Sequence, residues 1–93
     1  MKEKNIERAI KSYLKTVDGL FFWKEHGGMY STVGIPDLII CYKGKFIALE
    51  VKTPIGKATV MQVVQMQKIR KAGGLSKIVR SVSDVKEIIE SIQ

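Results

Sequence analysis

Apolar residues recur along the chain at helical spacing in three segments and form short extended runs between them. From residue 1 to about residue 17 they return every three or four positions, which predicts an amphipathic helix. Asp18-Gly19 ends this helix, because glycine favours the terminating conformation. Residues 20–25 are rich in aromatic side chains and predict the first strand.

Two further apolar runs, 38–42 and 46–52, flank the turn Lys43-Gly44-Lys45 and predict a β-hairpin. Both runs carry apolar residues at alternate and intervening positions, so both faces of the hairpin are expected to be covered by helices. The single cysteine, Cys41, lies inside the first of these runs. We therefore expect its thiol to be buried in the core.

The second half of the chain predicts a helix, a strand and a final helix. The helix spans 59–72 and stops at Gly73-Gly74, the strand spans 75–82, and Ser83-Asp84 begins the last helix as its cap. The order helix, three strands, helix, strand, helix predicts an α/β sandwich on a mixed sheet. At 93 residues the chain is expected to form one domain, 1–93.

The charge balance adds a strong positive field to this small domain. There are 16 basic residues against nine acidic ones, which gives a net charge of +7. Such a field favours a polyanionic partner, although solubility alone is an equal alternative. The sequence has no apolar run that predicts a membrane span and no signal-peptide pattern, and one cysteine fits a reducing, intracellular location.

Three charged residues are expected to meet at one end of the hairpin. Asp37 begins its first strand, and alternation places Glu50 and Lys52 on one face of its second strand. Antiparallel pairing brings Asp37 beside Val51. Two carboxylates with the Val51 carbonyl suit Mg²⁺ or Mn²⁺, and Lys52 can orient or deprotonate an attacking water. A surface group of salt bridges is the alternative.

Three polar residues could join these charges or have ordinary structural roles. Glu7 borders the apolar stripe of the first helix, where it either reaches water or is aimed at a site. Gln62 lies within the apolar stripe of the second long helix, where it either forms a capping box with Thr59 or serves a site. His26 lies in a glycine-rich loop, 26–34, and could touch a phosphate or simply be solvated.

The pair Pro36-Asp37 and Glu50-Val51-Lys52 resembles the signature of the PD-(D/E)XK nuclease superfamily. More of the chain is similar to one branch of it, the VRR-NUC domain, and the likeness covers nearly the whole sequence. The matching elements are Glu7, Gly34-Ile35-Pro36-Asp37, Glu50-Val51-Lys52, Gln62 with Ala72-Gly73, and Val79-Arg80-Ser81.

The resemblance implies a restriction-endonuclease-like αβββαβ core, with a central mixed sheet flanked by helices. It also implies the roles of the site residues. The catalytic residues would be Asp37, Glu50, Lys52, Gln62 and Glu7. The metal ligands would be Asp37, Glu50, the Val51 carbonyl and Glu7. Gln65 is the reserve for Gln62, because it lies on nearly the same helical face.

The expected function is a Mg²⁺- or Mn²⁺-dependent, structure-selective DNA endonuclease. The resemblance implies a stand-alone homodimer that resolves Holliday (four-way) junctions in the cytoplasm of a bacterium or a phage-infected host. The alternatives are a monomeric flap or nicking nuclease and a non-catalytic DNA-binding module. The first choices for DNA contacts are Lys57 beside the site loop, Arg80 on the last strand, and His26.

Overall fold

The computed structural model describes residues 2–27 and 32–93. Its elements follow the predicted order. They are α1 (Glu3–Leu14), β1 (Leu20–Lys24), β2 (Leu38–Tyr42), β3 (Lys45–Val51), α2 (Val60–Lys71), β4 (Leu75–Val79) and α3 (Val82–Ser91). Residues 28–31 of the predicted glycine-rich loop, and Met1 of the predicted first helix, lie outside the described part.

The strands form one mixed sheet in the order β1-β2-β3-β4. The first three are antiparallel to their neighbours, and β4 runs parallel to β3, as the helix between them requires. Tyr42 pairs with Lys45 across a two-residue turn. Both turn residues have positive φ, 51° at Lys43 and 75° at Gly44, the conformation that matches the twist of a tight hairpin.

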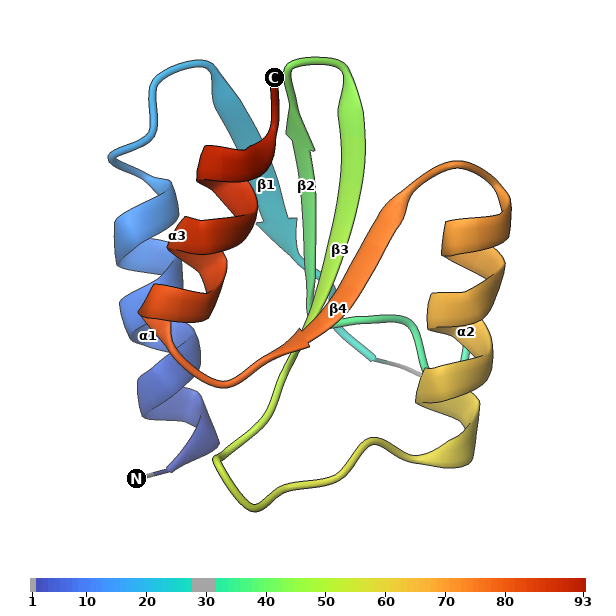
Figure 1. Ribbon diagram of the computed structural model, residues 1–93. Helices are drawn as coiled ribbons and strands as arrows, with labels where there is room; N and C mark the ends of the chain where they lie inside the picture. Colours follow the sequence, from blue (N-terminus) through green and yellow to red (C-terminus); the bar gives the residue numbers. More distant parts are fainter. Residues whose placement is uncertain (1, 28–31) are drawn as a thin grey trace.

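Helices α1 and α3 pack side by side on one face of the sheet, and α2 lies on the other (Figure 1). The main core forms between the sheet and the first pair of helices. Its buried members are Ile6, Ile10, Leu14, Leu38, Ile40, Ile47, Leu49, Val51, Val79, Val85, Ile88 and Ile89. In the described part of the chain no helix is both long and apolar enough to cross a membrane.

The second face of the sheet is only partly covered, and the prediction that Cys41 is buried is wrong. Cys41 is exposed. Helix α2 contacts β3 and β4, so it leaves much of the half of this face formed by β1 and β2 open, although Ile39 of β2 is buried there. Phe21, Trp23 and Phe46, which share that face with Cys41 by register, are 66%, 44% and 46% exposed. One helix is too narrow to cover four strands.

The start of the last helix also differs from the prediction. Strand β4 ends at Val79, and α3 begins at Val82 with Ser81 as its cap. The Ser81 hydroxyl accepts a hydrogen bond from the backbone N–H of Asp84 at 3.1 Å. Both Ser81 and Ser83 have the chemistry of a cap, and Ser81 takes the role because the strand stops three residues earlier than expected.

The segment that leads into β2 is held tightly against α2. Gly34 has φ +84°, and a Cβ built on it would lie 2.6 Å from the Met61 carbonyl oxygen. One residue earlier, the Val33 carbonyl accepts a hydrogen bond from Gln65 Nε2 at 3.0 Å. Glycine is therefore needed at position 34 both for its backbone conformation and for the close approach of the helix.

We predict that Gly34→Ala destabilises the fold by about 2–5 kcal/mol, because it adds a backbone clash to the cost of positive φ. Gly19→Ala is the matched control: φ there is +75°, but nothing lies within 4 Å of the added carbon. It should cost only about 1–2 kcal/mol. Urea unfolding of both variants measures the difference, and equal losses would show that the contact with Met61 is unimportant.

Candidate active site

Asp37 lies at the end of the hairpin opposite the Lys43-Gly44 turn. Its Oδ2 atom accepts a hydrogen bond from the backbone N–H of Val51 at 2.9 Å. Its own carbonyl accepts from the backbone N–H of Glu25 at 2.8 Å, which extends the pairing of β1 with β2. The structure thus brings Asp37 to the strand that carries Glu50 and Lys52, as alternation predicts.

Glu50 is a buried carboxylate with one unpartnered oxygen. Its residue is only 2% exposed. Oε2 accepts a hydrogen bond from Gln62 Nε2 at 3.1 Å and lies 3.5 Å from Lys52 Nζ. Oε1 is buried and has no hydrogen-bond partner among the described residues. An unpartnered buried acceptor costs free energy, so it needs a reason.

Burial raises the pKa of Glu50 to about 8, and the negative charge of Asp37 acts in the same direction. Lys52 opposes this shift but does not cancel it. Without a further cation, Glu50 is therefore mostly protonated at neutral pH. A cation beside Oε1 would reverse this balance and favour the carboxylate.

Gln62 has both of the roles that its position in the sequence allowed. Its Oε1 accepts from the backbone N–H of Thr59 at 2.8 Å, and its own backbone N–H donates to Thr59 Oγ1 at 3.1 Å. This capping box leaves Nε2 directed at Glu50. Gln65 instead binds Val33, so the structure places Gln62, and not Gln65, in the site.

Lys24, the last residue of β1, is a site residue that the sequence reasoning missed. Its Nζ lies 2.8 Å from Glu7 Oε1 and 3.2 Å from Asp37 Oδ1. Burial lowers the pKa of Lys24, but the hydrogen bond to Glu7 and the charge of Asp37 outweigh it and leave the pKa raised. Lys24 ends an apolar strand next to the predicted aspartate, and this position could have identified it from the sequence.

Glu7 is connected to the site by lysine side chains that contact its carboxylate. Oε1 binds Lys24, and Oε2 lies 3.6 Å from Lys11, one helical turn away on α1. Across residues 2–27 and 32–93, no three acidic, histidine or cysteine side chains gather closely enough to hold a metal together. Glu7 contacts Asp37 indirectly, through Lys24, and its part at a metal stays a prediction.

Arg80 fixes the loop that follows Lys52. Its Nη1 atom donates to the carbonyl oxygens of Thr53 at 2.6 Å and Gly56 at 2.7 Å. The backbone N–H of Lys52 donates to the Val79 carbonyl at 3.0 Å, which continues the pairing of β3 with β4. These bonds give Arg80 a positioning role beside the site, while its contact with DNA stays a prediction.

The other two residues expected to touch DNA are on the surface. Lys57 is exposed in the loop that Arg80 holds. His26 is exposed and lines a cleft of about 390 Å³ together with Lys24 and Asp37. The cleft opens the Asp37 end of the site to solvent, so His26 stands where an anionic substrate could approach.

The donor set fits a hard divalent cation. The unpartnered oxygen of Glu50, the carboxylate of Asp37 and the Val51 carbonyl would hold it, with water completing the coordination. All of these donors are oxygens, as Mg²⁺ and Mn²⁺ prefer. With too few side chains for an all-protein cage, the site suits an ion that retains several waters.

Comparison with solved structures finds the same arrangement of chain. A structure described as "VRR_NUC domain" matches with TM-score 0.78 and 25% sequence identity, over 98% of this chain and 97% of that one. A second, described as "VRR_NUC domain protein", matches with TM-score 0.75 and 18% identity, over 97% and 86% of the two chains. No protein-family model matches the sequence, and no curated protein matches it.

The αβββαβ core, with Asp37 and Glu50-Val51-Lys52 across one hairpin, is the fold of the matched VRR_NUC structures and suggests a nuclease of the PD-(D/E)XK type. The chain has the fold of the VRR-NUC domain over nearly its whole length. The resemblance seen in the sequence is thereby confirmed, and DNA is the substrate class that a nuclease domain implies.

We predict that Lys24→Met lowers the free energy of unfolding by about 1–3 kcal/mol in metal-free buffer. The variant leaves two partly buried carboxylates without their shared cation. Lys11→Met removes the same charge from the same Glu7, but from an i,i+4 surface pair, and should cost less than about 0.5 kcal/mol. Chemical denaturation of both variants measures the two changes in unfolding free energy. Similar losses of unfolding free energy would mean that Lys24 is an ordinary surface lysine.

Proposed function

We propose that this domain is a metal-dependent, structure-selective endonuclease that hydrolyses phosphodiester bonds of branched DNA. The observation that carries the proposal is the buried Glu50 carboxylate, whose Oε1 has no partner in the described protein while Lys52 stands at its other oxygen. Protein stability alone gives no reason for this arrangement, because an uncharged residue there would cost less.

Each residue of the site has a part in the proposed reaction. Glu50, Asp37 and the Val51 carbonyl would hold Mg²⁺ or Mn²⁺, which would supply Lewis-acid chemistry at the phosphate and lower the pKa of water. Lys52 orients or deprotonates the attacking water and stabilises charge that develops on the phosphate. Gln62, fixed by its bonds to Thr59, restricts the rotamer of Glu50.

The proposed substrate is the four-way junction, cut by a homodimer. A two-fold axis between two sites suits a junction with two-fold symmetry. The open half of the sheet supports self-association, because Phe21, Trp23 and Phe46 expose a large apolar area there. The rings of Phe21 and Trp23 lie 5.9 Å apart and form a compact pair at the free edge of the sheet.

We also propose a cytoplasmic setting, in a bacterium or a phage-infected host. The one cysteine, Cys41, is exposed, so an oxidising compartment would favour disulfide-linked pairs of chains.

The proposal predicts that the wild-type protein cuts labelled four-way junctions when Mg²⁺ or Mn²⁺ is present, and that EDTA abolishes cutting. Lys52→Ala should bind the junction normally but cut at least about 100-fold more slowly in single-turnover assays. Lys68→Ala, which removes an exposed lysine from α2, is the control and should cut at the wild-type rate.

Two results would contradict the proposal. Wild-type protein that binds DNA but leaves junctions, flaps and duplexes intact with either metal would be a binding module. A stable monomer that cuts flaps or nicks duplexes, and ignores junctions, would retain the hydrolytic chemistry and exclude the paired resolvase. Light scattering after size-exclusion chromatography gives the molar mass and so distinguishes this monomer from the proposed dimer.

A further inference from the structure

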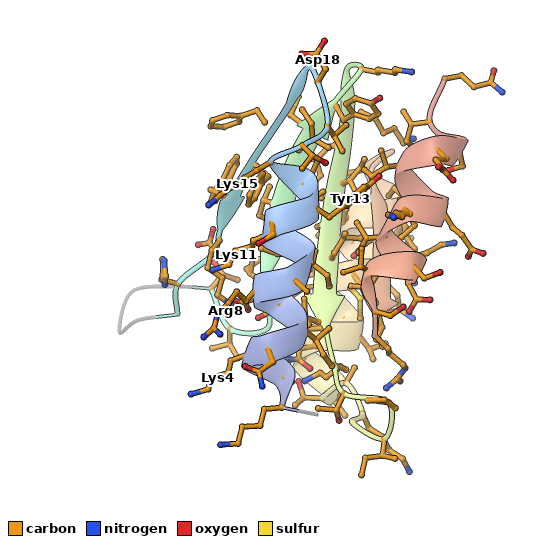
Figure 2. The ribbon with its side chains drawn as sticks, turned by 90° about the vertical axis from the view of Figure 1, so that its left-hand side faces the viewer. Lys4, Arg8, Lys11, Tyr13, Lys15 and Asp18 are labelled. Carbon is orange, nitrogen blue, oxygen red and sulfur yellow. The ribbon has the colours of Figure 1, made fainter. Side chains whose placement is uncertain are left out.

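Helix α1 carries a row of basic side chains that the site itself does not use. Lys4, Arg8, Lys11 and Lys15 recur at steps of four, three and four residues, here called the basic stripe. At about 100° per residue, these positions fall within an arc of about 60°. In Figure 2 they lie in a row along the helix, on the side away from α3, whereas Tyr13 lies on the side toward it.

The basic stripe is accessible and largely unneutralised. Lys4, Arg8 and Lys15 are exposed and form no ion pair within the part of the chain that the structure describes. Lys11 contacts one carboxylate, that of Glu7, which Lys24 already shares. Like charges in a row on one helix face repel one another. Solubility alone does not require these charges to lie on a single face.

A short series of contacts connects the basic stripe to the site. Lys11 Nζ lies 3.6 Å from Glu7 Oε2, and Glu7 Oε1 lies 2.8 Å from Lys24 Nζ. Lys24 in turn contacts Asp37 Oδ1 at 3.2 Å. A polyanion that lies along the stripe would therefore pass directly beside the carboxylates.

We propose that the basic stripe of α1 binds the phosphate backbone of one arm of a DNA substrate and leads it to the site. From Lys4 to Lys15 the stripe extends about 16 Å along the helix axis, which matches the rise of about five base pairs. A membrane surface does not fit, because the apolar face of this helix, Ile6, Ile10 and Leu14, is buried in the core. This inference rests on the proposed nuclease function.

The test is the salt dependence of binding to a fluorescent four-way junction in EDTA. The triple variant Lys4→Gln, Arg8→Gln, Lys15→Gln leaves Lys11 and its ion pair intact. If each side chain neutralises one phosphate, the slope of log K against log salt should fall in magnitude by about 2–3. The control variant Lys68→Gln, Lys71→Gln, Lys77→Gln removes equal charge from other exposed positions and should change the slope by less than about 1.

Because the three substituted side chains are exposed, the melting temperature should stay at the wild-type value. Arg8→Gln alone should lower the slope by about 1 if the triple variant is unstable. An unchanged slope, or equal changes in the two triple variants, would overturn the inference while wild-type cutting leaves the nuclease proposal standing. Wild-type protein that neither binds nor cuts DNA, or that binds only anionic phosphatidylserine vesicles, would overturn both.

Discussion

The register between β2 and β3 is the constraint on which the whole site depends. The tight turn at Lys43-Gly44 fixes that register from one end of the hairpin. At the other end, the hydrogen bond from the Val51 N–H to Asp37 Oδ2 closes it. Because side chains alternate along a strand, a slip by one residue would turn Glu50 and Lys52 to the opposite face. It would also separate them from the amide of Gln62.

Asp37 lies between two groups of site residues, one toward α1 with Lys24 and Glu7, the other toward α2 with Glu50 and Gln62. On the α1 side, Lys24 neutralises Asp37 and Glu7 together. On the α2 side, Glu50 is desolvated, and its pKa is raised to about 8 by burial and by Asp37. Each carboxylate thus has a lysine beside one oxygen, but Oε1 of the buried Glu50 has no hydrogen-bond partner among the described residues. This asymmetry explains why a metal would be bound beside Glu50 and not between Asp37 and Glu7.

The sequence predicted those features that local rules determine. The hairpin, the meeting of Asp37 with Val51 and the mixed sheet follow from turn chemistry, alternation and the crossover helix. The exposure of Cys41 did not follow, because it depends on how far α2 extends across the sheet. The contacts of Lys24 with Glu7, and of Arg80 with the carbonyls of Thr53 and Gly56, join residues at least 17 positions apart. Such contacts are set by packing of whole elements, and sequence spacing does not encode them.

Glu50 is the residue at which metal binding can be measured, because a cation beside its buried Oε1 would favour the carboxylate over the protonated acid. Burial and the charge of Asp37 raise the pKa of Glu50 to about 8, so a cation that binds at pH 7 would displace a proton from it. Calorimetric titration with Mn²⁺ in buffers of different ionisation enthalpy should therefore find proton release on binding at pH 7, and less release well above pH 8. Glu50→Gln should abolish both the release and most of the affinity. Binding of Mn²⁺ without proton release at pH 7, or with equal affinity in that variant, would show that the ion does not replace a proton on Glu50.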